Sequence, residues 1–468
     1  MIAFSRRRML AMTAGAAMAG LMAACGATPT VAPATTAPEA ATRAVEAPTE
    51  APKATQQVEL RFIKLSMSDK ETEYFEGTAI PAFEAAHPGI TVKVDMSDWG
   101  HLGEKLMTSF AGNLPVDLVE TGSDWVGPYA ARKQFMPLDD MIAKDYQEEI
   151  KDFYPEMVEI SRYAGKLCGL PYILDIRTLC YRKDQFEEAG YDPDVGPDTW
   201  DDLVSYATKL VQTDSEGNIT RAGYLLSAAS PTDAFFQYWY FLVQNGTDVV
   251  VPWGSWNTDD IKLETPEAKE ALQFMIDLIN EYKVSPITGM STKNPDLSPL
   301  SEGIASIADS GASIIGNFKR YAPDLLPVLG VSKPLMKKAR KHYACPNVYA
   351  IGTNTKSPDM AWELMKHMVS RETITGMLSA ESWTPPRKSI ATGAEYMQDP
   401  LLQAFQAIPE QGWGTTTPQA TEWPTLENIG NYIQAAVRLE MTVDEALAKA
   451  AEDTKRRIEE LVAATGAA

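Results

Sequence analysis

The chain has 468 residues, and its 63 acidic residues outnumber its 42 Lys and Arg residues, which gives a formal net charge of −21. This acidity argues against nucleic acid or an anionic membrane surface as a partner, because both are negatively charged. Residues 58–468 have a globular composition. This segment is longer than a single hydrophobic core usually accommodates, so the sequence predicts more than one folding unit.

Residues 1–24 predict an export signal of the lipoprotein type. The basic segment SRRRML at 5–10 resembles a twin-arginine signal, and the small apolar run that follows is shorter than the ~20 residues of a membrane span. LMAAC at 21–25 resembles a lipoprotein cleavage site. We therefore expect export and lipidation of Cys25, which would hold the protein at the outer face of the cell membrane. An uncleaved signal anchor is the alternative.

Residues 25–57 are predicted to be a disordered linker. They are rich in Ala, Thr, Pro and Glu and contain no aromatic residue, so they cannot bury enough apolar surface to offset chain entropy. The prolines favour an extended tether. No later segment is apolar for long enough to span a bilayer, so we expect the lipid to be the only membrane attachment.

Three cysteines remain after Cys25, at positions 168, 180 and 345. An odd number without the spacing of a metal site argues against a disulfide framework. We expect all three to be buried thiols.

The globular part begins with an alternation of strands and helices. Residues 58–65 and 90–94 have strand patterns, and residues 71–87 carry apolar side chains near helical spacing. This order predicts a parallel strand pair with a right-handed crossover. A second amphipathic helix over 100–112 leads to a buried strand at Leu118 and Val119.

The segment TGSDW at 121–125 follows that strand at its carboxyl end, where open α/β sheets place ligand crevices. On a loop at this position Trp125 can stack on a sugar ring while Asp124 accepts hydrogen bonds from hydroxyl groups. The alternative is that Trp125 anchors the next helix in the core.

Residues 165–184 (GKLCGLPYILDIRTLCYRKD) contain two apolar runs separated by Asp175 and Arg177. Pro171 cannot donate to a sheet ladder and suits a strand end or a crossing point. The residues alone fit either a β-hairpin in one sheet or a crossing between two sheets.

The second half of the chain is rich in tryptophan. Trp200 follows Thr199 and precedes Asp202, a pattern close to a helix capping box, which indicates a structural role. The helix at 234–243 (AFFQYWYFLV) is apolar on all sides, and Trp239 is our candidate for a ring that faces a cleft. Trp253 and Trp256 fit a cleft rim and an ordinary loop plug equally well.

Several ordered segments resemble the extracellular solute-binding proteins (family 1) of ABC importers, the sugar-binding group that includes maltose-binding protein. GKLCGLPYILDIRTLCYRKDQFEEAG at 165–190 resembles the family's first crossing between lobes, and FEAAHPGITVKV at 83–94 resembles its opening. The segments at 349–368, at 382–388 and at 442–447 resemble its second crossing, its return loop and its C-terminal pattern. One departure is that no aromatic residue directly follows Gly311.

The resemblance implies an α/β fold of two lobes, each a mainly parallel sheet flanked by helices. The crossings would lie near 172–178, 346–352 and 376–384. The N-terminal lobe would comprise 58–174 plus 347–380, and the C-terminal lobe 175–346 plus 381–468.

The resemblance also implies a function. The lobes would close on a carbohydrate or polyol by hinge motion and deliver it to the transmembrane subunits of an ABC permease, with the protein acting as a monomer, without a cofactor or metal. The ligand-binding residues would be Asp124, Trp125, Tyr172, Asp175, Trp239, Trp383 and Trp423.

The sequence gives no positive sign of an enzyme. It contains no G-x-S-x-G, H-E-x-x-H, G-x-x-x-x-G-K-[ST] or G-x-G-x-x-G motif. The remaining rival is a surface-anchored glycoside hydrolase, which needs only two well-placed carboxylates. We expect a binding protein in which the carboxylates bind hydroxyl groups.

Overall fold

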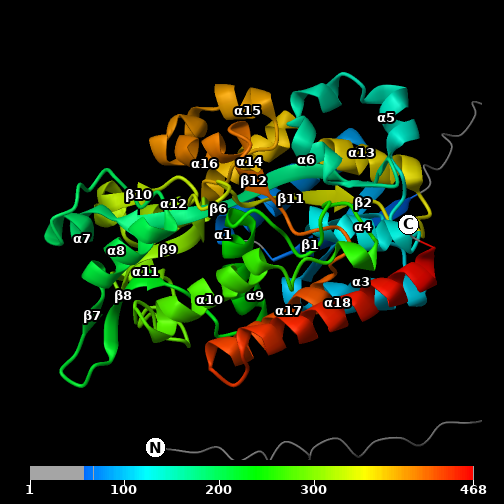
Figure 1. Cartoon of the computed structure of the whole chain (residues 1–468). Coiled ribbons are helices and arrows are strands. Elements are labelled where there is room, and N and C mark those ends of the chain that lie inside the picture. Colours follow the sequence, from blue (N-terminus) through cyan, green and yellow to red (C-terminus); the bar gives the residue numbers. More distant parts are fainter. Residues whose placement is uncertain (1–56, 67, 467–468) are drawn as a thin grey trace, which may run out of the picture. The chain divides into compact units, whose positions relative to one another are not determined.

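The computed structural model describes residues 57–66 and 68–466 (Figure 1). The predicted export signal, Cys25 and almost all of the predicted linker lie outside the described residues. Within the described part of the chain, no helix is long and apolar enough to cross a membrane.

The chain opens with the predicted parallel unit. Strand β1 pairs in parallel with β2 on one side and with β3 on the other, at Val58↔Ile90 and Phe62↔Leu118. The connecting helical segment is continuous but contains one π-helical turn, η1 (Phe75–Ala79). The elements are β1 (Val58–Leu65), α1 (Asp69–Tyr74), α2 (Ile80–Ala86), β2 (Ile90–Ser97), α3 (Trp99–Ala111) and β3 (Leu118–Gly122).

Strand β6 (Leu170–Arg182) occupies the centre of the sheet and is one continuous strand, so the hairpin alternative is wrong. Its first half pairs antiparallel with β11 (His342–Ala350), and its second half pairs antiparallel with β9 (Ala305–Gly311). Asp175 and Arg177 are therefore strand residues rather than part of a connecting segment. Pro171 is the second residue of β6, opposite a register shift between Asn347 and Val348, where a missing N–H is tolerated.

The described residues form a ten-stranded sheet in the order β2-β1-β3-β11-β6-β9-β8-β7, with β10 pairing with β6 and β12 with β11 beside this path. It has two halves that share β6. The first half contains the parallel pairs β1–β2 and β1–β3 and ends in β11, which is antiparallel to β3 and β6. The second half contains the parallel pair β8–β9, and β6 is antiparallel to β9. The remaining strands are β7 (Gln212–Thr213), β8 (Ile219–Leu225), β10 (Leu329–Val331) and β12 (Gly414–Thr415), with a separate hairpin of β4 (Arg162–Tyr163) and β5 (Lys166–Leu167).

Three segments that are distant in sequence meet at Leu174. Leu174 is opposite Pro346 in the β6–β11 ladder, and it also forms a bridge with Thr384. The three crossings expected from the sequence thus run side by side.

Helices cover the sheet, and Figure 1 shows α14 to α16 on the opposite side of β6 from α9, α10 and α17. Helix α17 (Trp423–Val437) packs against α9 (Pro231–Gln244) and α18 (Val443–Thr465). The other helices are α4 (Ser123–Ala131), α5 (Asp139–Asp145), α6 (Pro155–Glu159), α7 (Lys183–Glu188), α8 (Trp200–Leu210), α10 (Pro266–Asn280), α11 (Pro299–Glu302), α12 (Ser313–Tyr321), α13 (Pro358–Met368), α14 (Arg371–Glu381), α15 (Lys388–Gly393) and α16 (Pro400–Glu410), and 3₁₀ turns lie at Glu149–Asp152, Thr258–Asp260, Pro323–Val328 and Glu395–Gln398.

Several local predictions are confirmed. Thr199 and Asp202 form the capping box of α8, and Trp200 is buried with its indole N–H donating to Gln244 at 2.8 Å. Cys168, Cys180 and Cys345 are all buried, free thiols.

The contact between α9 and α17 depends on a glycine. A Cβ at Gly430 would overlap the backbone carbonyl of Pro231 at the start of α9. We predict that Gly430→Ala lowers the free energy of unfolding by about 1–3 kcal/mol through overpacking, although alanine favours a helix more than glycine does. The matched control is Gly393→Ala, because no heavy atom lies within 4 Å of a Cβ there. Thermal unfolding followed by circular dichroism measures both, and an unchanged or raised midpoint for Gly430→Ala would contradict the prediction.

Candidate ligand-binding site

The candidate site begins where β3 ends. Gly122 is the last residue of β3 and Ser123 the first of α4, so Asp124 and Trp125 lie in the first turn of a helix rather than on a loop. A Cβ at Gly122 would overlap the carboxylate of Asp124, so this close approach requires glycine. The carboxyl end of β3 thus places Asp124 and Trp125 together in the first turn of α4.

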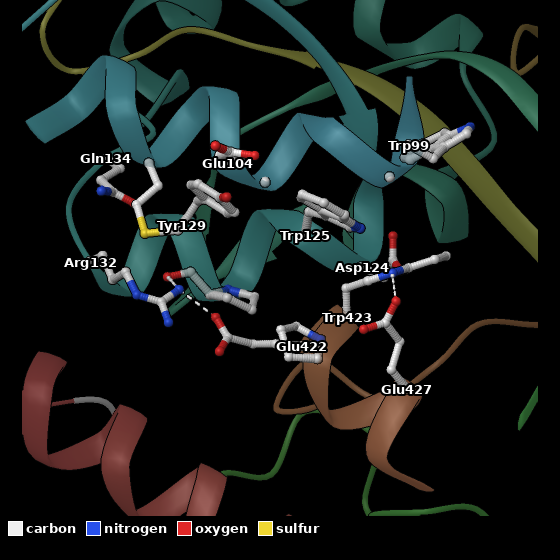
Figure 2. Close-up of a pocket in the computed structure, with 15 residues that line it drawn as sticks. Trp99, Glu104, Asp124, Trp125, Tyr129, Arg132, Gln134, Glu422, Trp423 and Glu427 are labelled. Carbon is white, nitrogen blue, oxygen red and sulfur yellow. Dashed lines mark hydrogen bonds and ion pairs between the residues drawn. The ribbon is translucent and has the colours of Figure 1, made fainter. Parts of the chain in front are cut away.

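Three indole rings form one wall of the cleft around Asp124 (Figure 2). The ring centroids of Trp99 and Trp125 are 6.3 Å apart, and those of Trp125 and Trp423 are 6.2 Å apart. Tyr129 stacks on Trp125 from the next turn of α4. A cavity of about 400 Å³ lies along this wall between α3, α4 and the start of α17, where Arg132 forms an ion pair with Glu422.

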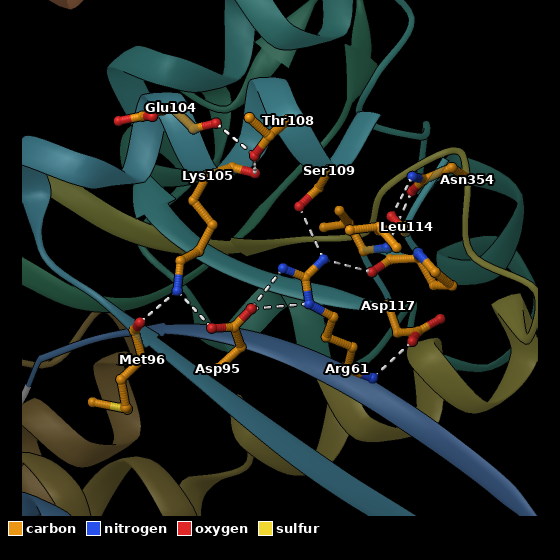
Figure 3. Close-up of polar contacts among 12 residues, drawn as sticks. Arg61, Asp95, Met96, Glu104, Lys105, Thr108, Ser109, Leu114, Asp117 and Asn354 are labelled. Atoms are coloured by element: carbon orange, nitrogen blue, oxygen red, sulfur yellow. Dashed lines mark hydrogen bonds and ion pairs between the residues drawn. The ribbon is translucent and has the colours of Figure 1, made fainter. Parts of the chain in front are cut away.

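A polar network holds α3, the helix that begins at Trp99, against the sheet through residues in its middle and last turns (Figure 3). Arg61 of β1 donates to Asp95 of β2 from Nε at 3.0 Å and from Nη2 at 2.6 Å, and Lys105 of α3 donates to the same carboxylate at 2.5 Å. The guanidinium of Arg61 also donates to Ser109 of α3 at 2.9 Å. Asp117, which has no evident partner in the sequence, accepts from the backbone N–H of Arg61 at 2.7 Å.

The central part of the cleft, a cavity of about 300 Å³, is charged. Lys64 of β1 is 2 % exposed and forms an ion pair with Glu120, which also accepts a hydrogen bond from the hydroxyl of Tyr172. Tyr172 stacks on Tyr349 with the ring centroids 4.2 Å apart. Burial raises the pKa of Glu71, and the nearby Lys64 ammonium opposes that shift.

On the far side of this cavity, Asp175 and Arg177 project from the same face of β6. They form an ion pair in which Nη2 of Arg177 lies 2.8 Å from Oδ2 of Asp175. Burial acts to lower the pKa of Arg177, but the attraction of Asp175 and neighbouring groups outweighs it and raises that pKa. The guanidinium carbon of Arg177 lies 5.0 Å from the ring centroid of Tyr343 and 6.0 Å from that of Phe236. Trp383, which follows α14, also lines this part of the cleft.

Asp124 makes no ion pair with any described side chain, unlike Glu120, Asp175 and Glu422 in the same lining. It is 8 % exposed, and burial raises its pKa from 3.8 to about 6, against the opposing effect of the backbone N–H groups at the start of α4. Its side-chain contacts include the thiol of Cys345, 4.0 Å from Oδ1. Asp124 lines both cavities described above.

The structure brings six of the seven candidate residues to the cleft: Asp124, Trp125, Tyr172, Asp175, Trp383 and Trp423. Trp239 is not among them, since it is fully buried and its indole N–H donates to Asp248 at 2.7 Å. Phe236, one turn earlier on α9, lines the cleft instead.

The loop tryptophans have structural roles. The indole N–H of Trp253 donates to the carbonyl oxygens of Thr416 and Thr417, and Trp256 is 7 % exposed and packs edge-on against Tyr163. Neither lines the cavities of the cleft.

Sequence reasoning missed several residues that line the cleft, namely Lys64, Trp99, Glu120, Arg177, Phe236 and Tyr343. Two signals could have found some of them: Lys64 is a lysine within an otherwise apolar strand end, and Arg177 is two positions from Asp175, which places both on one strand face. In the described ranges, no group of His, Cys, Asp or Glu residues is arranged to hold a metal ion.

Comparison with known proteins agrees with this architecture. A solute-binding protein from Thermotoga lettingae, solved with alpha-D-tagatose, superposes with a TM-score of 0.72 at 22 % identity, covering 86 % of this chain and 100 % of the other. The fold is thus the two-lobe α/β fold of solute-binding proteins, as the sequence predicts. The family model for the bacterial extracellular solute-binding protein matches residues 68–374, and the chain belongs to that family.

Two relatives extend the comparison. A Brucella abortus (strain 2308) protein, whose name specifies binding but no solute, is 24 % identical over 384 residues, which are 81 % of this chain and 88 % of that protein. The maltotriose-binding protein of Pyrococcus abyssi is 24 % identical over 312 residues, which are 64 % of this chain and 60 % of that protein.

The raised pKa of Asp124 predicts a pH dependence of stability. Between about pH 4 and pH 6 the folded protein keeps a proton on Asp124 that the unfolded chain has released, so this group favours folding more as the pH falls through that range. We predict that wild type gains about 1.4 kcal/mol of stability relative to Asp124→Asn between pH 7.5 and pH 5, because pH 5 lies about one unit below the pKa of Asp124 in the folded protein. Urea unfolding of both proteins at the two pH values measures the gain.

Asp214→Asn is the control for that experiment. Hydrogen bonding to Asn218 lowers the pKa of Asp214, and none of its hydrogen-bond donors titrates, so the effect of this group lies below about pH 4, outside the tested range. A difference between wild type and Asp124→Asn that does not change with pH would contradict the prediction.

Proposed function

We propose that this chain is the substrate-binding lipoprotein of an ABC importer and that it captures a carbohydrate or a related polyol. The observation that carries the proposal is the composition of the cleft, in which indole rings lie beside buried acids where the crossing strands meet. Pyranose faces pack on aromatic rings, while carboxylates accept hydrogen bonds from hydroxyl groups. The maltotriose-binding relative and the tagatose-bound neighbour support the same class of solute.

The lobes of this proposal are 58–174 plus 347–380 and 175–346 plus 381–468, and closure would occur by rotation about the crossings. A ligand favours closure only through its greater affinity for the closed state. Cys25 would carry the lipid anchor at the outer face of the membrane, residues 26–57 would let the protein reach the permease, and the protein would act as a monomer.

The glycoside hydrolase alternative lacks support from the site. Asp175, the second acid among the candidate ligand-binding residues, is already in an ion pair with Arg177, and the comparisons are with binding proteins. We propose that Asp124 and Asp175 bind solute without transferring protons, so that incubation with saccharides releases no new reducing ends.

One prediction of the proposed function concerns closure of the lobes. A thermal-shift screen over mono- and oligosaccharides, polyols and glycerol phosphates should find a ligand that, at 100 to 1,000 times its Kd, adds about 3–4 kcal/mol of stability. Small-angle scattering with that ligand should then give a smaller radius of gyration, because the closed state is more compact. An unchanged radius at saturation would contradict hinge closure.

Another prediction of the proposed function concerns the wall of indole rings. Trp125→Ala and Trp423→Ala should each weaken binding of the confirmed ligand by about tenfold to a hundredfold, because each removes a large apolar area from the contact. Isothermal titration calorimetry measures the loss. Trp253→Phe is the control, since Trp253 lies outside the cleft and its indole bonds only the loop at 416–417. If both alanine variants bind as tightly as wild type, these rings have only a packing role.

A further inference from the structure

The charges that line the cleft do not balance. Its two aromatic-walled cavities are lined by seven acids but only three bases, Lys64, Arg132 and Arg177. Each base forms an ion pair with one acid, namely Glu120, Glu422 and Asp175 respectively. The surplus is therefore negative, and it lies on Glu71, Glu104, Asp124 and Glu427.

Asp124 is the most deeply buried of these four acids. Glu71 caps the start of α1, and Glu427 accepts a hydrogen bond from the indole N–H of Trp423 at 3.1 Å, whereas Asp124 is 8 % exposed and has no cationic partner among the described side chains. A carboxylate buried without a counter-charge is costly. The helix N-terminus offsets only part of that cost, since burial still raises the pKa.

The surroundings of Asp124 suit a cation. Figure 2 shows Asp124 beside Trp125 and Trp423, whose ring faces carry a negative quadrupole. A hydroxyl group can donate one hydrogen bond to the carboxylate but leaves its charge unbalanced. An ammonium group donates hydrogen bonds, neutralises the charge and is attracted to the rings.

We propose that the solute carries a protonated amino group, as an amino sugar does, and that this ammonium lies against Asp124, Trp125 and Trp423. The inference rests on the proposed carbohydrate function and narrows its substrate class. The sugar ring itself would pack on the indole wall, and its remaining hydroxyl groups would face the paired charges of Lys64, Glu120, Asp175 and Arg177.

Matched sugars that differ only in their amino groups test this inference. We would measure binding by calorimetry for glucosamine with glucose and for galactosamine with galactose, in which one ammonium replaces one hydroxyl group. A third pair is unacetylated chitobiose with cellobiose, in which each of the two rings exchanges one hydroxyl group for an ammonium. In at least one pair the amino sugar should bind wild type about tenfold tighter or more, as expected for a desolvated cation against rings and a carboxylate. N-acetylation, which removes the charge, should abolish the preference.

Asp124→Asn should reduce that preference to about twofold or less, because the side chain keeps its shape but loses its charge. Both sugars of a pair are measured on the same variant, so a general loss of folding cannot mimic the change. Glu148→Gln is the charge-matched control, since it removes one acid that is 82 % exposed and far from the cleft lining, and should leave the preference intact.

The outcomes separate the two proposals. If neutral sugars bind as tightly as their amino partners, the amino-sugar inference is overturned while the carbohydrate function stands. If no sugar of either series binds and the thermal-shift screen finds no other carbohydrate or polyol that does, the carbohydrate function fails, and the inference fails with it.

Discussion

Strand β6 is the constraint on which the rest of the structure depends. Its thirteen residues belong to both halves of the sheet, so its pairing with β11 and β9 fixes the two halves relative to each other at the crossing. Because side chains alternate along a strand, Leu174 and Ile176 are buried in the core while Asp175 and Arg177 face the cleft. A slip of one residue would exchange these two sets, so the apolar face fixes the position of the charged pair.

Charge pairing separates the cleft residues that support the site from the unpaired acids, of which Asp124 is the most deeply buried. Lys64 pairs with Glu120 across the neighbouring strands β1 and β3, and Asp175 pairs with Arg177 within β6. An aromatic ring packs beside the cation of each pair. Such pairs add little net stability, because desolvation offsets much of their attraction. Their contribution is to hold polar groups in fixed positions inside a cleft. Asp124 lies in the same lining without such a partner, so its charge is available to a solute.

Much of the fold could be predicted because local patterns and tertiary packing agree. The β-α-β opening, the capping box at Thr199 and the buried thiols follow from periodicity and residue chemistry. The continuity of β6 could not be predicted in this way, since two charged residues near its middle interrupt the apolar run. They are tolerated in a strand because they pair with each other at the edge of a cleft.

The candidate site, like the fold, could be predicted only in part from the sequence. Asp124 and Trp125 were predictable from their place after a buried strand, whereas the choice between Phe236 and Trp239 was not. Helix α9 is apolar on all sides, so the hydrophobic periodicity of its sequence does not show which face is buried. The orientation of the helix depends on a residue outside it. Asp248 accepts a hydrogen bond from the indole N–H of Trp239 in the interior, and Phe236 then faces the cleft. The ring centroid of Phe236 lies 6.4 Å from that of Trp423, so the packing of α9 against α17 positions both rings in the cleft.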